Sequence, residues 1–298
     1  MTPGETPAPD AEKPPPAGGQ ARFGAWQPFT PRGVAAFAHA TFARVLLIEF
    51  IVALMAAAML VWFLQTAWFP TIRLAIKTLA LQGSIQHQEL TYPATAPGLL
   101  AEGHFLAFLV NVGTDPSGGL ASDFRVEFRQ RSALVCSLAG CLALPYPQAG
   151  TFQFNRADLE PRWDAWEPIL LGMAAVGMVF FLMLAWCALA TFYSGLAWLA
   201  AYFADRELNW GGSWRLASAS LMPGAVVLTA GLVLYGLTAL DLLRFALLVP
   251  LHLLLGPGFT LASVFFLPRT APAIRLSANP FAPAPTPPPP EESRERVD

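Results

Sequence analysis

The feature that most constrains this chain is a set of apolar runs, each long enough to cross a lipid bilayer. The first, residues 45–69, contains Glu49 as its only charge, and the second, residues 169–203, contains no charged residue. Two more follow at 221–240 and 245–267. A transmembrane helix needs about 20 predominantly apolar residues to cross a core of about 30 Å, so each run qualifies. The sequence therefore predicts an integral membrane protein with a four-span α-helical bundle.

The composition agrees with a membrane protein and carries no signature of catalysis. Charged residues make up 13% of the chain, against about 25% in soluble domains. The net charge of -2 provides no basic surface for nucleic acid. The sequence contains none of the common nucleotide-binding, metalloprotease or serine-hydrolase motifs, and its histidines are scattered. We therefore predict no enzyme activity, no cofactor and no metal site.

Changes in composition along the chain divide it into segments. Both ends are rich in proline and cannot bury enough apolar surface to offset the entropy of ordering. We predict a disordered cytoplasmic tail at 1–29, an amphipathic interfacial helix at 30–44, transmembrane helix 1 at 45–69, an extracytoplasmic β-rich domain at 70–166, transmembrane helix 2 with a cytoplasmic extension at 167–204, a cytoplasmic loop at 205–220, transmembrane helices 3 and 4 at 221–240 and 241–267, and a second disordered tail at 268–298.

Basic residues indicate the orientation. Arginine and lysine gather in the N-terminal flank, in the 205–220 connection and in the C-terminal flank, whereas the connection between spans three and four offers only Arg244, beside Asp241. The positive-inside rule then places both termini in the cytoplasm. The 70–166 insert lies outside, because segments of about 100 residues translocate largely regardless of charge. We predict a multi-pass protein of the bacterial cytoplasmic (inner) membrane.

Two helices allow alternatives. Thr30 and Pro31 are typical of a helix N-cap and first residue, and the helix that they begin either lies against the cytoplasmic leaflet or continues into the first span. The second apolar region would be about 52 Å long as a helix, which is more than one crossing needs. It forms either one tilted helix, which we favour, or two segments broken near Gly195.

The polar insert is predicted to be mainly β, with a short helix over 71–81 that continues the first span. Alternating apolar and polar residues indicate strands at 84–92, 105–112, 124–136 and 151–154. One face of the 124–136 strand carries alternating charges and is expected to be solvated. Cys136 and Cys141 lie in a compartment that permits disulfides, and they are either bridged or two reduced, buried side chains. Cys187, in the second span, is expected to serve in packing.

Small residues recur on two spans. Gly224 and Gly231 are seven residues apart in the third span, and Ala53 and Ala57 form a small-xxx-small pair in the first. Small side chains let helix backbones approach closely, which is how helices associate in lipid. These positions are predicted to mediate packing within the bundle; a homo-oligomer interface is the alternative.

Two ionisable residues lie within predicted spans. An ionisable residue inside a membrane is costly, so a functional role is the first hypothesis for it. Glu49 is close enough to the end of its span to pair with Arg44 or reach the interface, so we interpret it as structural. His252 follows Pro250, which breaks the helix locally. It either hydrogen-bonds the carbonyl freed near Pro250, the structural interpretation that we favour, or lines a polar cavity.

The order of parts resembles an uncharacterised bacterial membrane family, the domain of unknown function numbered 1189, which is distantly similar to Yip-type membrane proteins. The tract RLASASLMPGAVV at 215–227 opens the third span as in that family, and NVGTD at 111–115 is similar to its outer-domain turn. Here Thr114 precedes Asp115, the inverse of the family's order. The resemblance covers residues 29–269. It implies no enzyme activity, and some members carry a label linking them to maltodextrin use.

We therefore predict a non-catalytic sensor, adaptor or membrane-organising subunit. The alternative is an accessory component of a solute transporter, with carbohydrate as the solute that the resemblance suggests, and a membrane-bound enzyme ranks third. The expected partners are the lipid bilayer and either another membrane protein or a second copy of the chain. No nucleic acid is expected, and the sequence specifies no ligand.

Overall fold

The computed structural model describes residues 27–93, 95, 98–113 and 122–270. In this part of the chain, four helices are long and apolar enough to cross a membrane. The first, Phe42–Thr78, comprises α3 (Phe42–Phe63), the π-helical segment η2 (Leu64–Trp68) and α4 (Phe69–Thr78); the second is α5 (Arg156–Phe203); the third, Trp210–Gly236, comprises α6 (Trp210–Ser220) and α7 (Met222–Gly236); the fourth is α8 (Leu242–Val264). This arrangement agrees with the predicted helical membrane fold.

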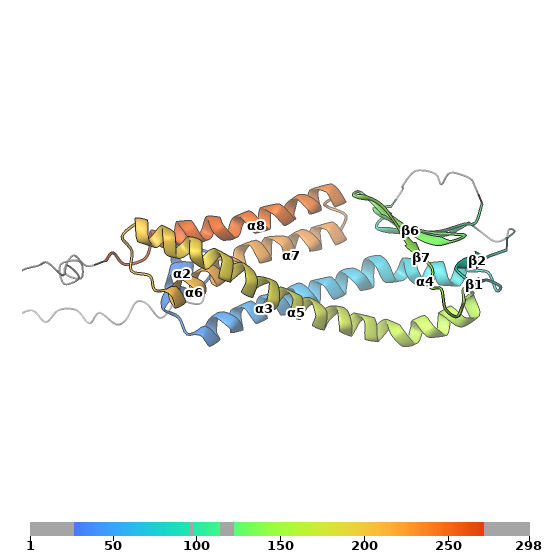
Figure 1. Cartoon of the computed structure of the whole chain (residues 1–298), viewed down its shortest axis with the longest axis horizontal. Coiled ribbons are helices and arrows are strands. Elements are labelled where there is room, and N and C mark those ends of the chain that lie inside the picture. The colour runs from blue at the N-terminus through green and yellow to red at the C-terminus, as the bar shows by residue number, and fades with distance from the viewer. Residues whose placement is uncertain (1–26, 94, 96–97, 114–121, 271–298) are drawn as a thin grey trace, which may run out of the picture.

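The molecule is elongated, with the helical bundle at one end and a separate β-sheet region at the other (Figure 1). We call the region that contains the strands, from Ser84 to Gln153, the β domain. The short helix α2 (Pro31–Ala36), α6 and the C-terminal end of α8 lie together at the opposite end of the bundle, which we call the α2 end. Most of both predicted disordered tails, and the Thr114–Asp115 turn, lie outside the described residues.

The predicted interfacial helix at 30–44 is wrong in extent and environment. Thr30 caps α2 as predicted, accepting a hydrogen bond from the Gly33 amide at 3.1 Å. The helix passes into the 3-10 turn η1 (Phe37–His39) and stops before α3 begins at Phe42. Its apolar side chains are fully buried against α6 and α8, with Val34 and Phe37 both 0% exposed. The apolar face is therefore covered by protein and not by lipid.

The predicted cytoplasmic loop at 205–220 is also wrong, because most of it is the helix α6. The Asn209 side chain caps this helix by accepting from the Gly212 amide at 2.6 Å. No proline occurs between Asn209 and Met222. Pro223 lies in the first turn of α7, where the missing amide hydrogen is tolerated. Only Leu221, itself in the helical region of φ and ψ, separates α6 from α7, and we call the two together the α6–α7 rod.

Two long helices connect the bundle to the β domain. α5 is a single helix of 48 residues that begins at Arg156, earlier than the expected start at 167, with Asn155 as its N-cap. It is unbroken at Gly195. The first span also continues, through η2 into α4. Pro70 lies in the first turn of α4, just after the π-helical turn. Proline has no amide hydrogen, and its ring clashes with the carbonyl four residues earlier in a regular α-helix. Arg73 of α4 and Glu167 of α5 form an ion pair between these two helices.

The β domain contains two sheets. The larger has the order β3-β4-β5-β6-β7, antiparallel except for the parallel pair β4–β5, and the smaller has the order β2-β1-β8. The strands are β1 (Ser84–Gln86), β2 (Glu89–Thr91), β3 (Leu99–Glu102), β4 (Leu106–Asn111), β5 (Phe124–Arg129), β6 (Ser132–Ser137), β7 (Gly140–Pro145) and β8 (Thr151–Gln153). The apolar face of the larger sheet packs on α4.

Two of the predicted strands are hairpins. Residues 84–92 fold back at His87 and Gln88, which have φ of 48° and 66° and form a tight turn between β1 and β2. Residues 124–136 likewise comprise β5 and most of β6, which pair antiparallel across the turn at 130–131. β3 and β7 were not predicted, because neither has the alternation that identifies a half-buried strand.

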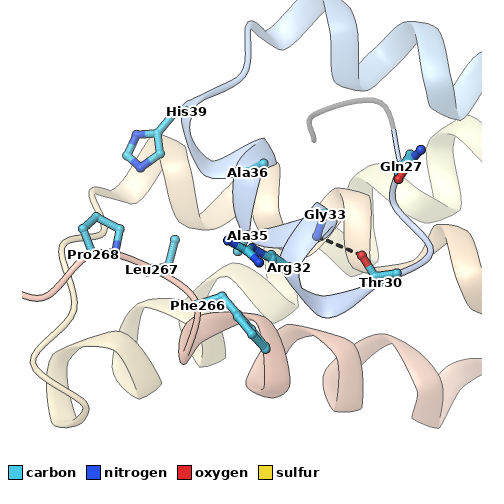
Figure 2. A pocket seen from close by; sticks show the side chains of 10 residues that line it. All are labelled: Gln27, Thr30, Arg32, Gly33, Ala35, Ala36, His39, Phe266, Leu267 and Pro268. Atoms are coloured by element: carbon cyan, nitrogen blue, oxygen red, sulfur yellow. Dashed lines mark hydrogen bonds between the residues drawn. The ribbon is translucent and has the colours of Figure 1, made fainter. Parts of the chain in front are cut away.

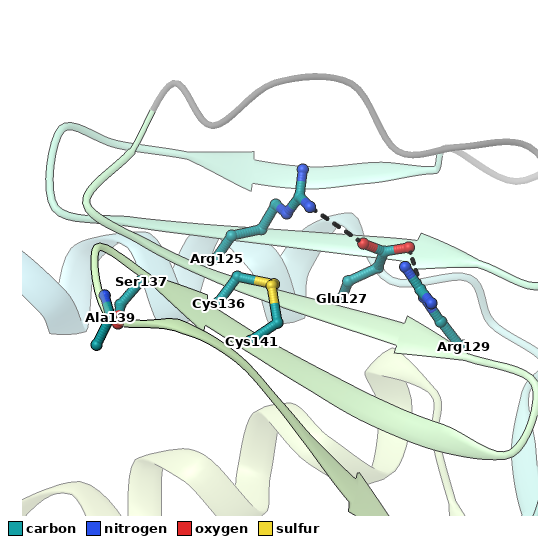
Figure 3. The surroundings of a disulfide bond; sticks show 7 residues. All are labelled: Arg125, Glu127, Arg129, Cys136, Ser137, Ala139 and Cys141. Carbon is teal, nitrogen blue, oxygen red and sulfur yellow. Dashed lines mark hydrogen bonds and ion pairs between the residues drawn. A yellow bond between two sulfur atoms is a disulfide. The ribbon is translucent and has the colours of Figure 1, made fainter.

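The charged face of β5 is not simply solvated as expected. Glu127 is 0% exposed and forms ion pairs with Arg129 at 3.0 Å and Arg125 at 3.6 Å (Figure 3). A buried carboxylate needs such partners, because an isolated buried charge is strongly destabilising. Nearby, the Tyr146 phenol donates to the Arg129 carbonyl at 2.9 Å, and burial raises the pKa of Tyr146 to about 12.

Candidate functional site

A buried line of polar side chains crosses the bundle near the α2 end. Glu49 of α3 is 1% exposed and accepts a hydrogen bond from the Ser218 hydroxyl of α6. Two residues further along the rod, the hydroxyls of Ser220 and Thr260 are 2.7 Å apart and both residues are fully buried. We call Glu49, Ser218, Ser220 and Thr260 the polar seam. It joins α3, the α6–α7 rod and α8.

The seam changes the interpretation of Glu49. The sequence predicted a carboxylate that reaches the interface or pairs with Arg44, but the side chain is enclosed in the bundle and held by Ser218. A polar group in a lipid-embedded interior is costly unless it is hydrogen-bonded. Sequence reasoning missed Ser218, Ser220 and Thr260, because serine and threonine are common in transmembrane helices and their spacing alone does not reveal a partner.

His252 lies where α8 crosses α7. It is 9% exposed, and its backbone carbonyl and Nδ1 approach Gly224 so closely that a β-carbon there would be 2.8 Å and 2.7 Å from them. Nδ1 is buried and makes no hydrogen bond of normal geometry within the described residues. Gly224 is therefore the residue that permits this crossing, as its small size predicted.

His252 also lines a cavity between the four spanning helices. The cavity has a volume of about 270 Å³ and is lined by side chains from α3, α5, α7 and α8. Apart from His252 and Thr229, its walls are apolar, including Trp186 and Phe245. The predicted alternative of a polar cavity is thus replaced by an apolar one with a single imidazole at its edge.

The other predicted packing residues lie at helix contacts within the chain. A β-carbon at Gly231 would be 2.2 Å from Cδ1 of Leu248, so α7 and α8 are in close contact there. Ala53 is 0% exposed in a cluster with Trp186, and Ala57 is 3% exposed beside an apolar groove between α3 and α5. The structure places all these positions in the intramolecular bundle; the homo-oligomer alternative stays a prediction.

The sheet end of the rod is fixed to the β domain. The phenol of Tyr235, one residue before the end of α7, donates to Oδ2 of Asp123 at 2.7 Å. Its ring contacts Phe105 of the β domain at 4.9 Å between centroids and stacks on Phe245 of α8 at 5.2 Å, while Phe63 of α3 contacts Phe105 at 5.4 Å. We call these five residues the aromatic junction. It holds three helices against the sheet.

Sequence reasoning did not find the junction. Neither Asp123 nor Tyr235 was assigned a role from the sequence. Their hydrogen bond joins residues 112 positions apart, and no local pattern reports a contact of that separation. The one available signal was the position of a tyrosine at the end of an apolar run, which is typical of a membrane interface.

At the α2 end, arginines fix the short helices to the bundle. Arg215 of α6 donates to the Ala38 carbonyl at 2.8 Å, and Arg206 donates to the Leu267 carbonyl at 2.6 Å. These bonds cover backbone carbonyls that helix ends and turns leave without partners. The basic residues predicted to lie in the cytoplasm thus include two with structural contacts.

A pocket opens at the same end. It has a volume of about 430 Å³ and lies between α2 with η1 on one side and the segment after α8 on the other (Figure 2). Arg32 and His39 line the first side, and Phe266 and Pro268 line the second. The pocket therefore combines basic and apolar groups.

The three cysteines, all in the described part of the chain, do not form a metal site, and each has a defined place in the structure. Cys136 and Cys141 form a disulfide next to the turn of the β6–β7 hairpin (Figure 3). Cys187 is free and exposed on α5, so it does not pack inside the bundle as expected. Among the described residues, no three His, Cys, Asp or Glu side chains gather in a group that could hold a metal ion.

These features define a class: a protein with four helices long and apolar enough to span a membrane, two of which extend into a separate β domain. No model of a known family matches the sequence, and neither a curated protein nor a solved structure matches it. The function is therefore argued from the site itself.

Proposed function

We propose that this chain is a non-catalytic membrane sensor or adaptor, in which the α6–α7 rod couples the β domain to the opposite membrane face. The observation that carries the proposal is that one rod is hydrogen-bonded at both ends. Tyr235 bonds Asp123 at the sheet end, and Ser218 bonds Glu49 at the α2 end. A partner that shifts the β domain would displace Asp123, and the rod would transmit that displacement to the polar seam.

The geometry suits such a relay. Ser218 and Tyr235 are separated by about 25 Å along the helix axis, at a rise of 1.5 Å per residue. Two consecutive helices with one residue between them can shift together, and small translations of packed helices are a common form of transmembrane or interdomain switching. Coupling needs a physical element that both ends bias, and the rod has a specific bond at each end.

The orientation is part of the proposal. Arg32, Arg206, Arg215 and Arg269 belong to the α2 end, which supports a cytoplasmic location for it and for both termini. The Cys136–Cys141 disulfide supports an oxidising compartment for the β domain. We accordingly assign the chain to a bacterial inner membrane, with the β domain extracytoplasmic, and keep membership of the domain 1189 family as a proposal that rests on the 215–227 tract.

The test is hydrogen exchange of α6 in lipid nanodiscs. Tyr235→Phe removes the hydroxyl that bonds Asp123 and leaves the ring in the junction. We expect faster exchange of the amides around Ser218 in this variant. The matched control is Tyr202→Phe on α5, whose ring is 67% exposed, and it should leave α6 unchanged. If Tyr235→Phe alters exchange only in the β domain, the rod does not couple the two ends and the proposal fails.

The second candidate function is an accessory subunit of a solute transporter, which the cavity beside His252 favours. A cavity of about 270 Å³ between all four spanning helices is close to the lower size of small-molecule sites, about 300 Å³. Its apolar walls suit an apolar solute better than the carbohydrate that the family resemblance suggests. Solute flux in reconstituted vesicles that is lost in His252→Leu would establish this function over the first.

A further inference from the structure

The β6–β7 hairpin exposes an apolar turn and an apolar strand. Leu138, in the turn, is 60% exposed, and Leu142 and Leu144, on β7, are 64% and 47% exposed. β7 is the last strand of the larger sheet and every residue in it is exposed. The turn residues 137–140 are Ser, Leu, Ala and Gly, without a charge. Exposed apolar patches of this kind mark interaction surfaces.

Leu142 and Leu144 of β7 extend the core face of the larger sheet. Leu142 is paired with Val135 and Leu144 with Ala133, and directly paired residues point to the same face. On that face, Phe128 of β5, which is paired with Ala133, packs into the core beside α4. The apolar face is therefore continuous from the core to β7, but the outer part extends beyond the helix that covers the rest.

The strand register places the turn at the level of the bundle's end. Arg125 is paired with Cys136 in antiparallel β5 and β6, so continuing the register by two residues sets Leu138 level with Asp123. Asp123 accepts from Tyr235, one residue before the end of α7. Because β5 and β6 are adjacent strands, Leu138 is then about one strand spacing, about 5 Å, to the side of Asp123. Figure 1 shows the hairpin reaching toward the connection between α7 and α8.

We propose that this turn inserts into the bilayer surface on the β-domain side, with lipid acyl chains as the partner of Leu138 and Leu142. The position at the end of a spanning helix selects lipid, because the lipid-facing belt of the bundle ends at the same level; Leu243 and Leu247 of α8 are 55% and 61% exposed there. The Cys136–Cys141 disulfide joins the two strands directly behind the turn (Figure 3).

The Cys136–Cys141 disulfide favours insertion of the turn into lipid. A turn that is already ordered loses little conformational freedom when it enters the interface, which favours insertion. Its few polar groups, the backbone amides and Ser137, stay near the headgroups, since only the tip needs to enter. Insertion would also fix the tilt of the β domain relative to the bundle at a further point, in addition to α4, α5 and the aromatic junction. This inference depends on the spanning helices and not on the proposed relay.

The first experiment uses the unmodified protein in phospholipid nanodiscs. Hydroxyl-radical footprinting reports the solvent access of individual leucines. Leu81, which follows α4 and is 76% exposed, is the reference because it has the same chemistry and lies beyond the bundle. We expect Leu138 to be oxidised at least fivefold more slowly than Leu81. Equal oxidation of the two leucines would overturn the proposal.

The second experiment identifies the partner. A photoreactive benzoylphenylalanine is placed at Leu138 or, as the control, at exposed Gln148 beyond the far end of β7, about 20 Å along the strand from the turn. Illumination in nanodiscs should give a phospholipid adduct by mass spectrometry at 138 and none at 148. A cross-linked dimer at 138 would identify a second copy of the chain and reject lipid, and equal lipid adducts at both positions would also reject the site.

Discussion

At the scale of single residues, the bundle shows how polar groups buried between long apolar helices acquire partners. Glu49 has a bond from Ser218, and Ser220 and Thr260 bond each other. His252 differs, because its Nδ1 is buried beside Gly224 without a hydrogen bond of normal geometry in the described chain. The seam is thus built of satisfied groups, whose removal should be felt in stability, whereas the imidazole is the residue with spare hydrogen-bonding capacity.

Ser218→Ala should destabilise the bundle by about 1–2 kcal/mol, because it leaves the buried Glu49 carboxyl group without that donor. The matched control is Ser194→Ala. Ser194 is equally buried, but its hydroxyl bonds only the Thr191 carbonyl of its own helix, an interaction that adds little to helix stability. Reversible unfolding of both variants in mixed micelles measures the difference. Equal losses for the two variants would contradict the role assigned to Ser218.

At the scale of elements, the contacts of α7 with α8 distinguish glycines that the sequence treated alike. At Gly224 a new β-carbon would meet the His252 backbone carbonyl at 2.8 Å, whereas at Gly231 it would meet the tip of the flexible Leu248 side chain at 2.2 Å. A backbone obstacle cannot rotate away, but a leucine can change rotamer. The two positions therefore differ in how strictly they require glycine.

Gly224→Ala should reduce the yield of folded protein strongly, and Gly231→Ala should cost less, about 1–2 kcal/mol, as expected for overpacking that a side chain can relieve. Gly258→Ala in α8 is the control, since an added β-carbon there would meet no atom within 4 Å other than those of its chain neighbours and its own helix backbone. It should be neutral or slightly stabilising because alanine is the better helix former. Size-exclusion yield and melting temperature give the order, and a greater loss for Gly231→Ala would be inconsistent with the structure.

The helices were largely predictable from sequence, and the β domain was not. Apolar length alone determines a span, so the four runs between residues 45 and 267 were found with only their ends displaced. α6 was missed because its serines and glycines resemble a loop, while its Asn209 cap was not recognised. In the β domain, the parallel pair β4–β5 joins strands with residues 112–123 between them, and β7 depends on the disulfide-linked hairpin. Such pairings have no local signal.

At the scale of the whole molecule, every route between the β domain and the α2 end runs along a helix. α4 and α5 enter the β domain directly, and the rod reaches it through Tyr235 and Asp123. The first two routes are covalent and cannot be released, whereas the third depends on one hydrogen bond and ring contacts. A reversible change in the relation between the two ends would therefore begin at the aromatic junction, which is why the proposed relay is placed in the rod.

The orientation of these routes is tested by cysteine labelling in intact cells. Gln148→Cys reports the β domain and Glu207→Cys reports the connection between α5 and α6; both positions are exposed, whereas Ser213, in the same segment, is 0% exposed and would resist labelling from either side. Both variants are made in a Cys187→Ala background, because Cys187 is the free cysteine of the described chain, and the disulfide keeps Cys136 and Cys141 unreactive.

A membrane-impermeant maleimide should label Gln148→Cys in intact cells and Glu207→Cys only after the membrane is permeabilised. The physical reason is the charge distribution: basic residues at the α2 end are retained in the cytoplasm, and an insert of about 100 residues crosses irrespective of its charge. The reverse pattern would place the β domain in the cytoplasm, where a stable disulfide is not expected. Labelling of both positions from outside would instead mean that α5 does not cross the membrane, which its long apolar run makes the most costly outcome.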